Sequence, residues 1–277
     1  MYNVQLTMYN SASEKWLLHC TFYIVNFSFL MKGVLICGGS GTRLRPLTEI
    51  TNKSLLPVYD KPLINYPLQI LLDAGIHDIA VITGPEHMDQ IAKYLGSGSR
   101  FGCEFSFKVQ EKPGGIAQAL GLAEEFVDGD NCCVILGDNV YFCDLAPTIK
   151  SFKNGAHLFL KEVSDPQRFG VVEIDNNNLA IKQFNTVKIT SIEEKPLKPK
   201  SNLISTGCYI YDHRCFDIIR NLKPSARGEL EITDVSNWYV QKGEITGTVL
   251  HDEWIDAGTF ESLFRASEIA RQHQLPA

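Results

Sequence analysis

The residues best suited to chemistry in this chain are a glycine-rich loop and two cations that lie close to it in sequence. The loop, Gly38-Gly39-Ser40-Gly41-Thr42-Arg43, follows an apolar run at 34–37 that is typical of a buried strand. Successive amides in such a loop can turn their N–H groups to one side and bind a phosphate. Arg43 adds a planar fork of donors, and Lys53 adds a second positive charge ten residues later. The stretch 32–62 therefore predicts a site for a phosphorylated ligand.

Two carboxylates could hold a metal ion opposite this loop. Asp138 follows the apolar run 132–136, and Asp256 lies in the segment Trp254-Ile255-Asp256-Ala257-Gly258. A carboxylate at a strand end can bind Mg²⁺ together with substrate phosphates. A single aspartate in this position more often caps the next helix. The phosphate-type loop and the second carboxylate favour the metal interpretation.

Two further charged segments can each be interpreted in two ways. Glu194-Lys195-Pro196 follows a predicted strand, where Lys195 could neutralise a second phosphate and Glu194 could accept from sugar hydroxyls. Such a pair is commonly a solvated surface pair that contributes little. The charged segment 227–234 begins a helix, and it could be a solvated first turn or a rim of the site.

The elements that must position these residues alternate between strand and helix in the first half. Apolar runs predict strands over 34–37, 79–83, 105–109 and 132–136, and helical spacing predicts helices over 62–74, 87–95 and 115–126. This alternation indicates a doubly wound α/β sheet, in which ligands bind outside the carboxyl ends of the strands. The Gly38 loop and Asp138 both follow strands, so we expect them to face one crevice.

Short strands dominate the second half. The predicted elements are strands over 158–163, 171–174, 179–184, 187–192, 204–211 and 245–250, and helices over 215–221, 231–242 and 260–272. This pattern predicts a smaller, mostly β lobe that folds onto the first half and shares its crevice.

Composition excludes several classes of protein. The chain has 277 residues, 44% of them hydrophobic, which is enough for one large or two small cores. A net charge of −6 argues against nucleic acid or an acidic membrane surface as the main partner. The eight cysteines form no CxxC pair, which argues against structural zinc or a disulfide framework and favours a reducing, cytoplasmic setting. No GxSxG, HExxH or Walker-type motif is present.

The first thirty residues form a separate segment. Residues 16–31 are apolar, but they fall short of the roughly 20 residues that a membrane span needs. No basic n-region and no small-residue cleavage site accompany them. We therefore expect a non-catalytic extension over 1–30, no membrane association, and one functional domain over 31–277.

Taken together, the motifs resemble those of a known family. GGSGTRLRPLT, NKSLLPVYDKP, LGDN, RFGVVE, EEKP, PKSN, TGCYIYD, KPSARGELEITD and WIDAGT occur in the order found in the sugar-1-phosphate nucleotidylyltransferases. ARGELEITD and EEKPLKPKSN resemble the thymidylyltransferase branch. The resemblance implies a Rossmann-like doubly wound mixed sheet with a smaller β-rich sugar-binding lobe. It also implies transfer from dTTP to glucose 1-phosphate, giving dTDP-glucose and pyrophosphate, with Mg²⁺ as cofactor, in a homo-oligomer that serves dTDP-rhamnose or another dTDP-deoxysugar.

The resemblance assigns a role to each matching residue. The implied triphosphate loop is Gly38, Gly39, Gly41, Thr42 and Arg43. The implied catalytic cations are Arg43, Lys53 and Lys195, and the implied base-reading residues are Gln110 and Gly115. The implied magnesium ligands are Asp138, which also contacts the nucleotide, and Asp256. The implied sugar contacts are Gly170, Glu194, Lys195, Ser205 and Tyr209.

The chain also departs from the family pattern. Phe169 stands where the family usually has tyrosine, and Ser54 stands where it commonly has glutamine. Between Asn178 and Glu193 the chain carries about seven extra residues, which we interpret as a lengthened hairpin beside the sugar pocket that could alter acceptor specificity. The sequence ends near Ala277 without the helical tail of longer members, so feedback control through that tail is not expected.

Two alternative functions remain open at this point. One is a UTP-using or dual-specificity nucleotidylyltransferase. The other is a regulatory subunit that binds nucleotide sugars and has lost activity, although intact cations and carboxylates at the implied catalytic positions argue against such decay.

Overall fold

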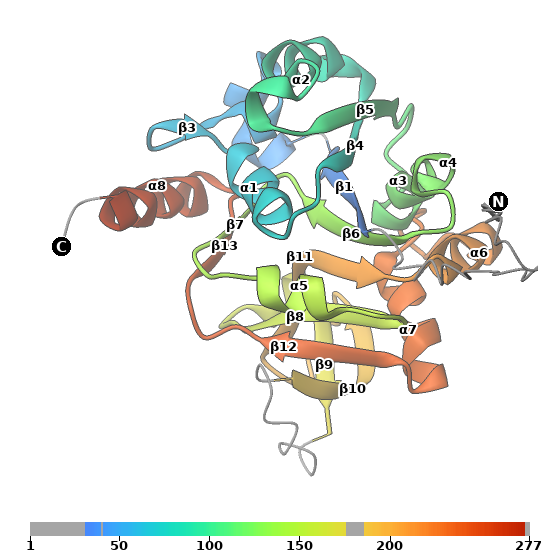
Figure 1. Ribbon diagram of the computed structural model, residues 1–277. Helices are drawn as coiled ribbons and strands as arrows, with labels where there is room; N and C mark the ends of the chain where they lie inside the picture. Colours follow the sequence, from blue (N-terminus) through green and yellow to red (C-terminus); the bar gives the residue numbers. More distant parts are fainter. Residues whose placement is uncertain (1–30, 40, 176–185, 275–277) are drawn as a thin grey trace, which may run out of the picture.

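In the part of the chain that the structure describes, a nine-stranded mixed sheet forms the centre of the fold (Figure 1). The computed structural model describes residues 31–39, 41–175 and 186–274. The strand order within them is β5-β4-β1-β6-β11-β8-β12-β10-β9. The strands of this sheet are β1 (Met31–Cys37), β4 (Asp78–Thr83), β5 (Glu104–Val109), β6 (Asn131–Leu136), β8 (Ala156–Glu162), β9 (Gly170–Ile174), β10 (Thr186–Glu194), β11 (Leu203–Tyr211) and β12 (Ile245–Val249).

Helices cover the sheet, and two small ribbons complete the fold. The helices are α1 (Asn65–Asp73), α2 (Met88–Leu95), α3 (Ile116–Gly121), α4 (Glu124–Val127), α5 (Ala146–Ser151), α6 (Arg214–Asn221), α7 (Ile232–Lys242) and α8 (Phe260–Gln274). Strands β2 (Pro57–Val58) and β3 (Lys61–Pro62) pair with each other, and β7 (Asn139–Tyr141) pairs with β13 (Trp254–Asp256).

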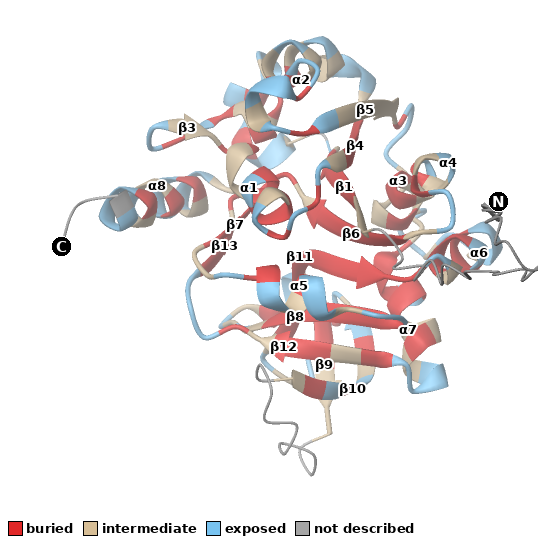
Figure 2. Ribbon diagram, in the orientation of Figure 1, coloured by how far each residue is buried: buried red, intermediate tan, exposed pale blue. Residues whose placement is uncertain are grey.

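The central strands are buried on both faces, as the uninterrupted apolar run of β1 predicts. Val34 and Ile36 join the core beneath α3, α6 and α7, whereas Leu35 and Cys37 join the core on the side of α1, α2 and α5. Figure 2 shows the strands in the middle of the sheet mostly buried. Full burial of each such side chain contributes about 1.5–3 kcal/mol. The predicted α/β sheet with helices on both faces is therefore confirmed for the first half.

The parallel half of the sheet brings the two predicted phosphate and metal segments to one edge. β1 lies between β4 and β6 and runs parallel to both. The Gly137 amide, just after β6, donates to the carbonyl of Ile36 at 2.8 Å. The loop after β1 and the aspartate after β6 therefore start from neighbouring points, as the strand-end argument predicts.

Two predicted features of the first half differ in detail. The helix predicted over 115–126 is wrong as one element, because the chain forms two short helices, α3 and α4. Leu122 and Ala123 donate to carbonyls three residues back, which tightens the chain between them. α1 begins at Asn65 rather than at 62, and Pro67 lies in its first turn, where its missing N–H costs no hydrogen bond.

The second half does not form a sheet of its own. β11 pairs antiparallel with both β6 and β8, so the later strands extend the first sheet. β11 is buried almost throughout its length, and it has a neighbouring strand on each side. The mostly β character predicted for this half is confirmed, and its strands continue the sheet of the first half.

Some expectations lie outside the described residues. These are the extension over 1–30 and most of the lengthened connection, including the strand predicted over 179–184; the flanking strands β9 and β10 pair antiparallel. Among residues 31–39, 41–175 and 186–274, no helix is both long and apolar enough to cross a membrane.

Candidate active site

A cavity of about 790 Å³ brings together residues from most of the predicted site. The predicted residues that line it are Thr42, Arg43, Asp138, Gly170, Glu194, Lys195, Ser205, Tyr209 and Asp256. The predicted residues that do not line it are Gly38, Gly39, Gly41, Lys53, Gln110 and Gly115. Lys53 nevertheless reaches the cavity wall, because its ammonium group pairs with Asp138.

The two predicted metal carboxylates are placed side by side by the β7–β13 ribbon. Asp256 is in register with Asn139, the residue that follows Asp138. The Ala257 amide donates to the backbone carbonyl of Asp138 at 2.9 Å. Two aspartates that are far apart in sequence therefore meet at one end of a short antiparallel pair.

Asp138 forms a buried ion pair with Lys53. Burial raises the pKa of the Asp138 carboxyl, but the charge and hydrogen bond of Lys53 outweigh burial and lower the pKa below its ordinary value. Burial lowers the pKa of Lys53, and Asp138 in turn raises it above its ordinary value. The charges of Asp138 and Lys53 are therefore both present at neutral pH.

Asn52 holds the turn that carries Lys53 in place. Its side chain accepts from the Ser54 amide at 2.9 Å and donates to the Cys37 carbonyl at 3.1 Å.

Asp256 has the opposite shift. Burial, followed by the negative charge of Asp138, raises the pKa of Asp256 to about 6. The positive charges of Lys53, Arg43 and Arg168 offset part of this effect, and Arg168 Nη2 lies 3.2 Å from Asp256 Oδ2. A buried carboxylate whose pKa is raised by the negative charge of a neighbouring carboxylate lies in an environment suited to a cation. Hard oxygen donors of this kind fit Mg²⁺, with substrate phosphates completing its coordination.

This shift predicts how Asp256 affects stability. An unfolded aspartate has a pKa of about 3.9, so between that value and the raised value of about 6 the native state binds more protons than the unfolded state. The metal-free protein should therefore lose stability as pH rises from about 4 to 6. We expect Asp256→Asn to be more stable than wild type by about 1–3 kcal/mol at pH 8, with no difference near pH 4.

Urea denaturation in a chelating buffer at both pH values measures this effect. Asp217→Asn, at an exposed position on α6, is the matched control and should show no such pH dependence. If Asp256→Asn were no more stable than wild type at pH 8, this result would contradict the raised pKa of Asp256.

The glycine-rich loop is shaped by close contacts. Gly41 has a φ of 57°, and a Cβ at this position would lie 2.8 Å from Thr48 Cγ2. The Thr48 hydroxyl donates to the Gly41 carbonyl at 2.8 Å and fixes the turn. Gly258 allows a second approach, because a Cβ there would lie 2.7 Å from Arg43 Nη2. Arg43 is thus held beside the Asp256 segment, at the point where the glycine-rich loop meets the cavity.

The predicted base-reading residues form a separate cluster next to the loop. Gln110 Nε2 donates to the Gly115 carbonyl at 3.1 Å and to Gln118 Oε1 at 2.7 Å. A Cβ on Gly38 would lie 3.1 Å from Gln110 Oε1, so the loop passes directly over this amide. Gly115 has a φ of 98°, and a Cβ there would lie 2.3 Å from the Leu230 carbonyl oxygen, so this position requires glycine.

The predicted sugar residues converge on Gly170. Glu194 of β10 is in register with Gly170 of β9. A Cβ on Gly170 would lie 3.2 Å from Ser205 Oγ, 3.3 Å from Thr233 Oγ1 and 3.5 Å from Glu194 Oε2. Thr233 donates to Glu194, which fixes the carboxylate. The glycine therefore leaves open a small space that is lined by hydroxyl and carboxylate oxygens.

Arg227 is part of the site, which answers the open interpretation of segment 227–234. It lines the cavity and lies 3.5 Å from Glu194 Oε1 and 3.4 Å from Glu231 Oε1. Lys195 lies 3.4 Å from the same Glu194 oxygen and has a φ of 44°, an unusual backbone conformation for a lysine. The segment therefore forms a structured rim rather than a solvated first turn.

Phe169, which replaces the usual tyrosine, packs as part of the cavity wall. Its ring meets Trp254 in a T-shaped contact, with centroids 5.7 Å apart. The Arg168 guanidinium lies 5.1 Å above the Phe169 ring. Phe169 thus packs through its aromatic ring, and it lacks the hydroxyl that a tyrosine would carry.

Ser54, the other departure from the family, has a buried and unpaired hydroxyl. Among the residues the structure describes, its Oγ is the buried side-chain oxygen or nitrogen that lacks a hydrogen-bond partner. The neighbouring Cys37 thiol is at most a weak partner. A Cβ on Gly137 would lie 2.8 Å from both Ser54 Oγ and Cys37 Sγ, so glycine is required before Asp138.

We expect Ser54→Ala to leave stability unchanged or to raise it by up to about 1 kcal/mol, because it removes an unsatisfied hydroxyl. Urea denaturation measures the change. Ser236→Ala is the matched control, since the Ser236 hydroxyl is buried but lies 2.6 Å from Tyr211 Oη, and it should destabilise by about 1–2 kcal/mol. A loss above 1 kcal/mol in Ser54→Ala would show that a partner satisfies this oxygen.

Sequence reasoning did not identify Arg168 or Thr233 as functional residues. Both lie within recognised motifs, RFGVVE and ARGELEITD, but neither has a periodic or spacing signal of its own. Their contacts with Asp256 and Glu194 depend on strands and helices distant in sequence.

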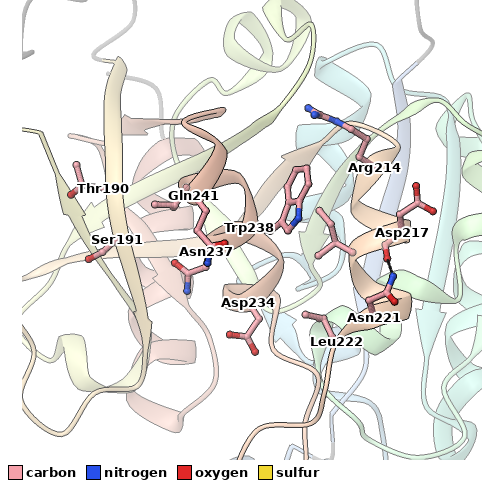
Figure 3. Close-up of a pocket in the computed structure, with 12 residues that line it drawn as sticks. Thr190, Ser191, Arg214, Asp217, Asn221, Leu222, Asp234, Asn237, Trp238 and Gln241 are labelled. Carbon is pink, nitrogen blue, oxygen red and sulfur yellow. Dashed lines mark hydrogen bonds between the residues drawn. The ribbon is translucent and has the colours of Figure 1, made fainter.

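A second cavity, of about 700 Å³, lies between α6, α7 and β10 (Figure 3). Arg214 of α6 lies beside Trp238 of α7 in the wall of this cavity, with its guanidinium carbon 5.6 Å from the ring centroid. Arg214 is already paired with Asp212 and Glu244. None of the predicted site residues lines this cavity, so it is separate from the candidate active site.

Comparison with known proteins gives the family. Residues 32–273 match the family model described as nucleotidyl transferase. A glucose-1-phosphate thymidylyltransferase of Neisseria meningitidis is 46% identical over 250 residues, covering 88% of this chain and 84% of the relative. A glucose-1-phosphate thymidylyltransferase of Mycolicibacterium smegmatis is 42% identical over 250 residues, with the same two coverages.

Solved structures are similar over the same region. A crystal structure from Bacillus anthracis, provisionally described as a glucose-1-phosphate thymidylyltransferase in complex with sucrose, has a TM-score of 0.81 at 48% identity and covers 89% of this chain and 98% of that chain. A UDP-glucose pyrophosphorylase complexed with UDP-glucose has a TM-score of 0.78 at 23% identity, covering 88% and 100%, which shows a shared fold alone. The chain therefore belongs to the nucleotidyl transferase family and, within it, to the glucose-1-phosphate thymidylyltransferases.

Proposed function

We propose that the protein converts dTTP and glucose 1-phosphate to dTDP-glucose and pyrophosphate. The observation that carries this proposal is the single cavity in which paired aspartates and Arg43 adjoin an oxygen-lined space around Gly170. Relatives at 42–46% identity over 88% of the chain carry the name of this activity. The substrates, the cofactor and the role of each residue follow as parts of the same proposal.

In the proposed reaction, a phosphate oxygen of glucose 1-phosphate attacks the α-phosphorus of dTTP in line, and pyrophosphate leaves. No general base is needed, since the attacking phosphate is already ionised. Catalysis then consists of positioning and of neutralising charge with preorganised cations. Arg43 and the glycine-rich loop bind the triphosphate, Lys53 stabilises negative charge near the α-phosphate, and Lys195 binds the sugar phosphate.

Asp138 and Asp256 are the proposed ligands of Mg²⁺, which when bound supplies positive charge to the triphosphate. Gln110 and Gly115 would bind the base beside the loop. Glu194, Ser205, Tyr209 and the open space at Gly170 would bind glucose. Thr233 and Arg227 keep Glu194 in place for this purpose.

Residues 31–277 constitute the proposed catalytic domain, in a Rossmann-like arrangement whose later strands serve as the sugar-binding part. Residues 1–30 are proposed to take no part in catalysis. The exposed Phe260 and Phe264 on α8 fit a subunit contact, as a homo-oligomer requires. A cytoplasmic location fits the phosphorylated substrates and the free, mostly buried cysteines of the described chain.

Pyrophosphate release over a grid of nucleoside triphosphates and sugar 1-phosphates tests the proposal. We expect release with dTTP and glucose 1-phosphate, and loss of at least about 100-fold when a chelator removes the metal. No release from any pair would contradict an enzymatic function. Equal rates with UTP and dTTP would support the alternative of dual nucleotide use, and binding without turnover would support the alternative of a regulatory subunit.

A further inference from the structure

The Arg168 guanidinium is paired with one carboxylate oxygen of Asp256, a proposed metal ligand. Arg168 Nη2 lies 3.2 Å from Asp256 Oδ2, and Arg168 Nη1 lies 2.8 Å from Asp165 Oδ2. One guanidinium therefore bridges two carboxylates. The shorter of its two contacts is to Asp165, which does not line the cavity.

A short turn aims this side chain. Arg168 ends a 3₁₀ turn over Pro166–Arg168, and the Phe169 amide closes the turn on the Pro166 carbonyl at 3.0 Å. Pro166 is buried, which fixes the base of the turn. The guanidinium itself rests on the Phe169 ring, above the wall that Phe169 forms with Trp254. The backbone is thus fixed, while the end of the side chain can change partner.

The two cations that pair with the aspartates differ in freedom. The Lys53 side chain, paired with Asp138, is 16% exposed. The Arg168 side chain is 38% exposed and has a second carboxylate within reach. Moving Arg168 away from Asp256 leaves its charge paired with Asp165, whereas moving Lys53 would leave a buried charge unpaired. Arg168 is therefore the cation that can leave.

We propose that Arg168 is a positioning residue that occupies Asp256 in the metal-free protein and turns to Asp165 alone when a divalent cation binds. This inference rests on the proposed function, because it takes Asp256 as a metal ligand. A metal ion that arrives alone must compete with the guanidinium for Asp256. A metal ion that arrives bound to a triphosphate already has anionic ligands. It depends less on Asp256, so the guanidinium competes with it less effectively. Arg168 would thus disfavour a metal-loaded protein that lacks nucleotide.

Mn²⁺ binding to the protein without substrates tests this directly. The free ion is followed by electron paramagnetic resonance, and Asp256→Asn defines the component of binding that depends on Asp256. We expect Arg168→Gln to tighten that component by about 5-fold, which is the scale of a partly exposed ion pair. Asp165→Asn should weaken it by about 2-fold, because the guanidinium loses its alternative partner.

Two controls separate competition from a general change of charge. Lys195→Gln removes a positive charge from the same cavity without a contact to Asp256, and Arg220→Gln removes one from α6. Neither should tighten the Asp256-dependent component as Arg168→Gln does. Thermal unfolding of each variant checks that the fold is retained.

Equal Mn²⁺ affinity in wild type and Arg168→Gln would overturn the inference, and so would the absence of Asp256-dependent binding in both. Equal tightening by Lys195→Gln would also overturn it. Thymidylyl transfer is assayed separately, so the two proposals fail independently. Transfer without an Arg168 effect rejects the inference alone, and an Arg168 effect without transfer rejects the proposed function alone.

Discussion

Replacing Asp138 with asparagine is expected to lower turnover by about 10³-fold while the protein still folds. Asparagine keeps the shape and can still cap a turn, but it lacks the negative charge that a metal ion and Lys53 require. It also leaves the Lys53 ammonium in a buried site without its counter-charge, so we expect a loss of about 1–3 kcal/mol in stability. Initial rates of dTDP-glucose formation and urea denaturation measure the two effects.

The matched control for this variant is Asp217→Asn, which makes the same chemical change at an exposed position of α6 outside the cavity. Its rate should equal that of wild type. If Asp138→Asn kept a near-normal rate, Asp138 would be a structural cap only, and the proposed metal site would be wrong.

Replacing Lys53 with methionine is expected to lower kcat/KM by about 10²–10³-fold and to destabilise the protein by about 2–4 kcal/mol. The methionine retains most of the apolar stem but leaves Asp138 buried without its partner. The same rate assay and denaturation measure both losses.

The double variant Lys53→Met/Asp138→Asn makes this prediction sharper. Because neither member of the pair is then charged, the double variant should be more stable than Lys53→Met alone. Its activity should not recover, since both the cation and the carboxylate are missing. A double variant as unstable as the sum of the single changes would show that the ion pair does not couple the two residues.

The strand-end argument could be made from sequence because β1 and β6 are long, apolar and buried on both faces. The end of such an apolar run marks the end of the strand. The Gly38 loop comes directly after β1, and Asp138 comes just after β6. The sugar residues were predictable only by resemblance. Gly170, Glu194 and Ser205 meet through strand register and through Thr233 of α7, neither of which a local pattern specifies.

Other parts of the site could not be predicted for identifiable reasons. β7 and β13 have three residues each, too few for a periodic signal, yet their pairing places Asp256 beside Asp138. The unpaired hydroxyl of Ser54 depends on how closely Cys37 and Gly137 pack around it. The role of Arg168 depends on a turn that only the folded chain brings to Asp256.

The place of β12 in the sheet has a consequence for how the protein is made. β12 is the last of the nine strands to leave the ribosome, yet it lies between β8 and β10, which are synthesised earlier. A nascent chain that stops before Ile245 therefore exposes the edges of two strands that are already complete. Such a chain also lacks Asp256. Co-translational assembly of the sheet must wait until nearly all of the polypeptide has emerged, and during that wait the open edges are exposed to non-native strand pairing.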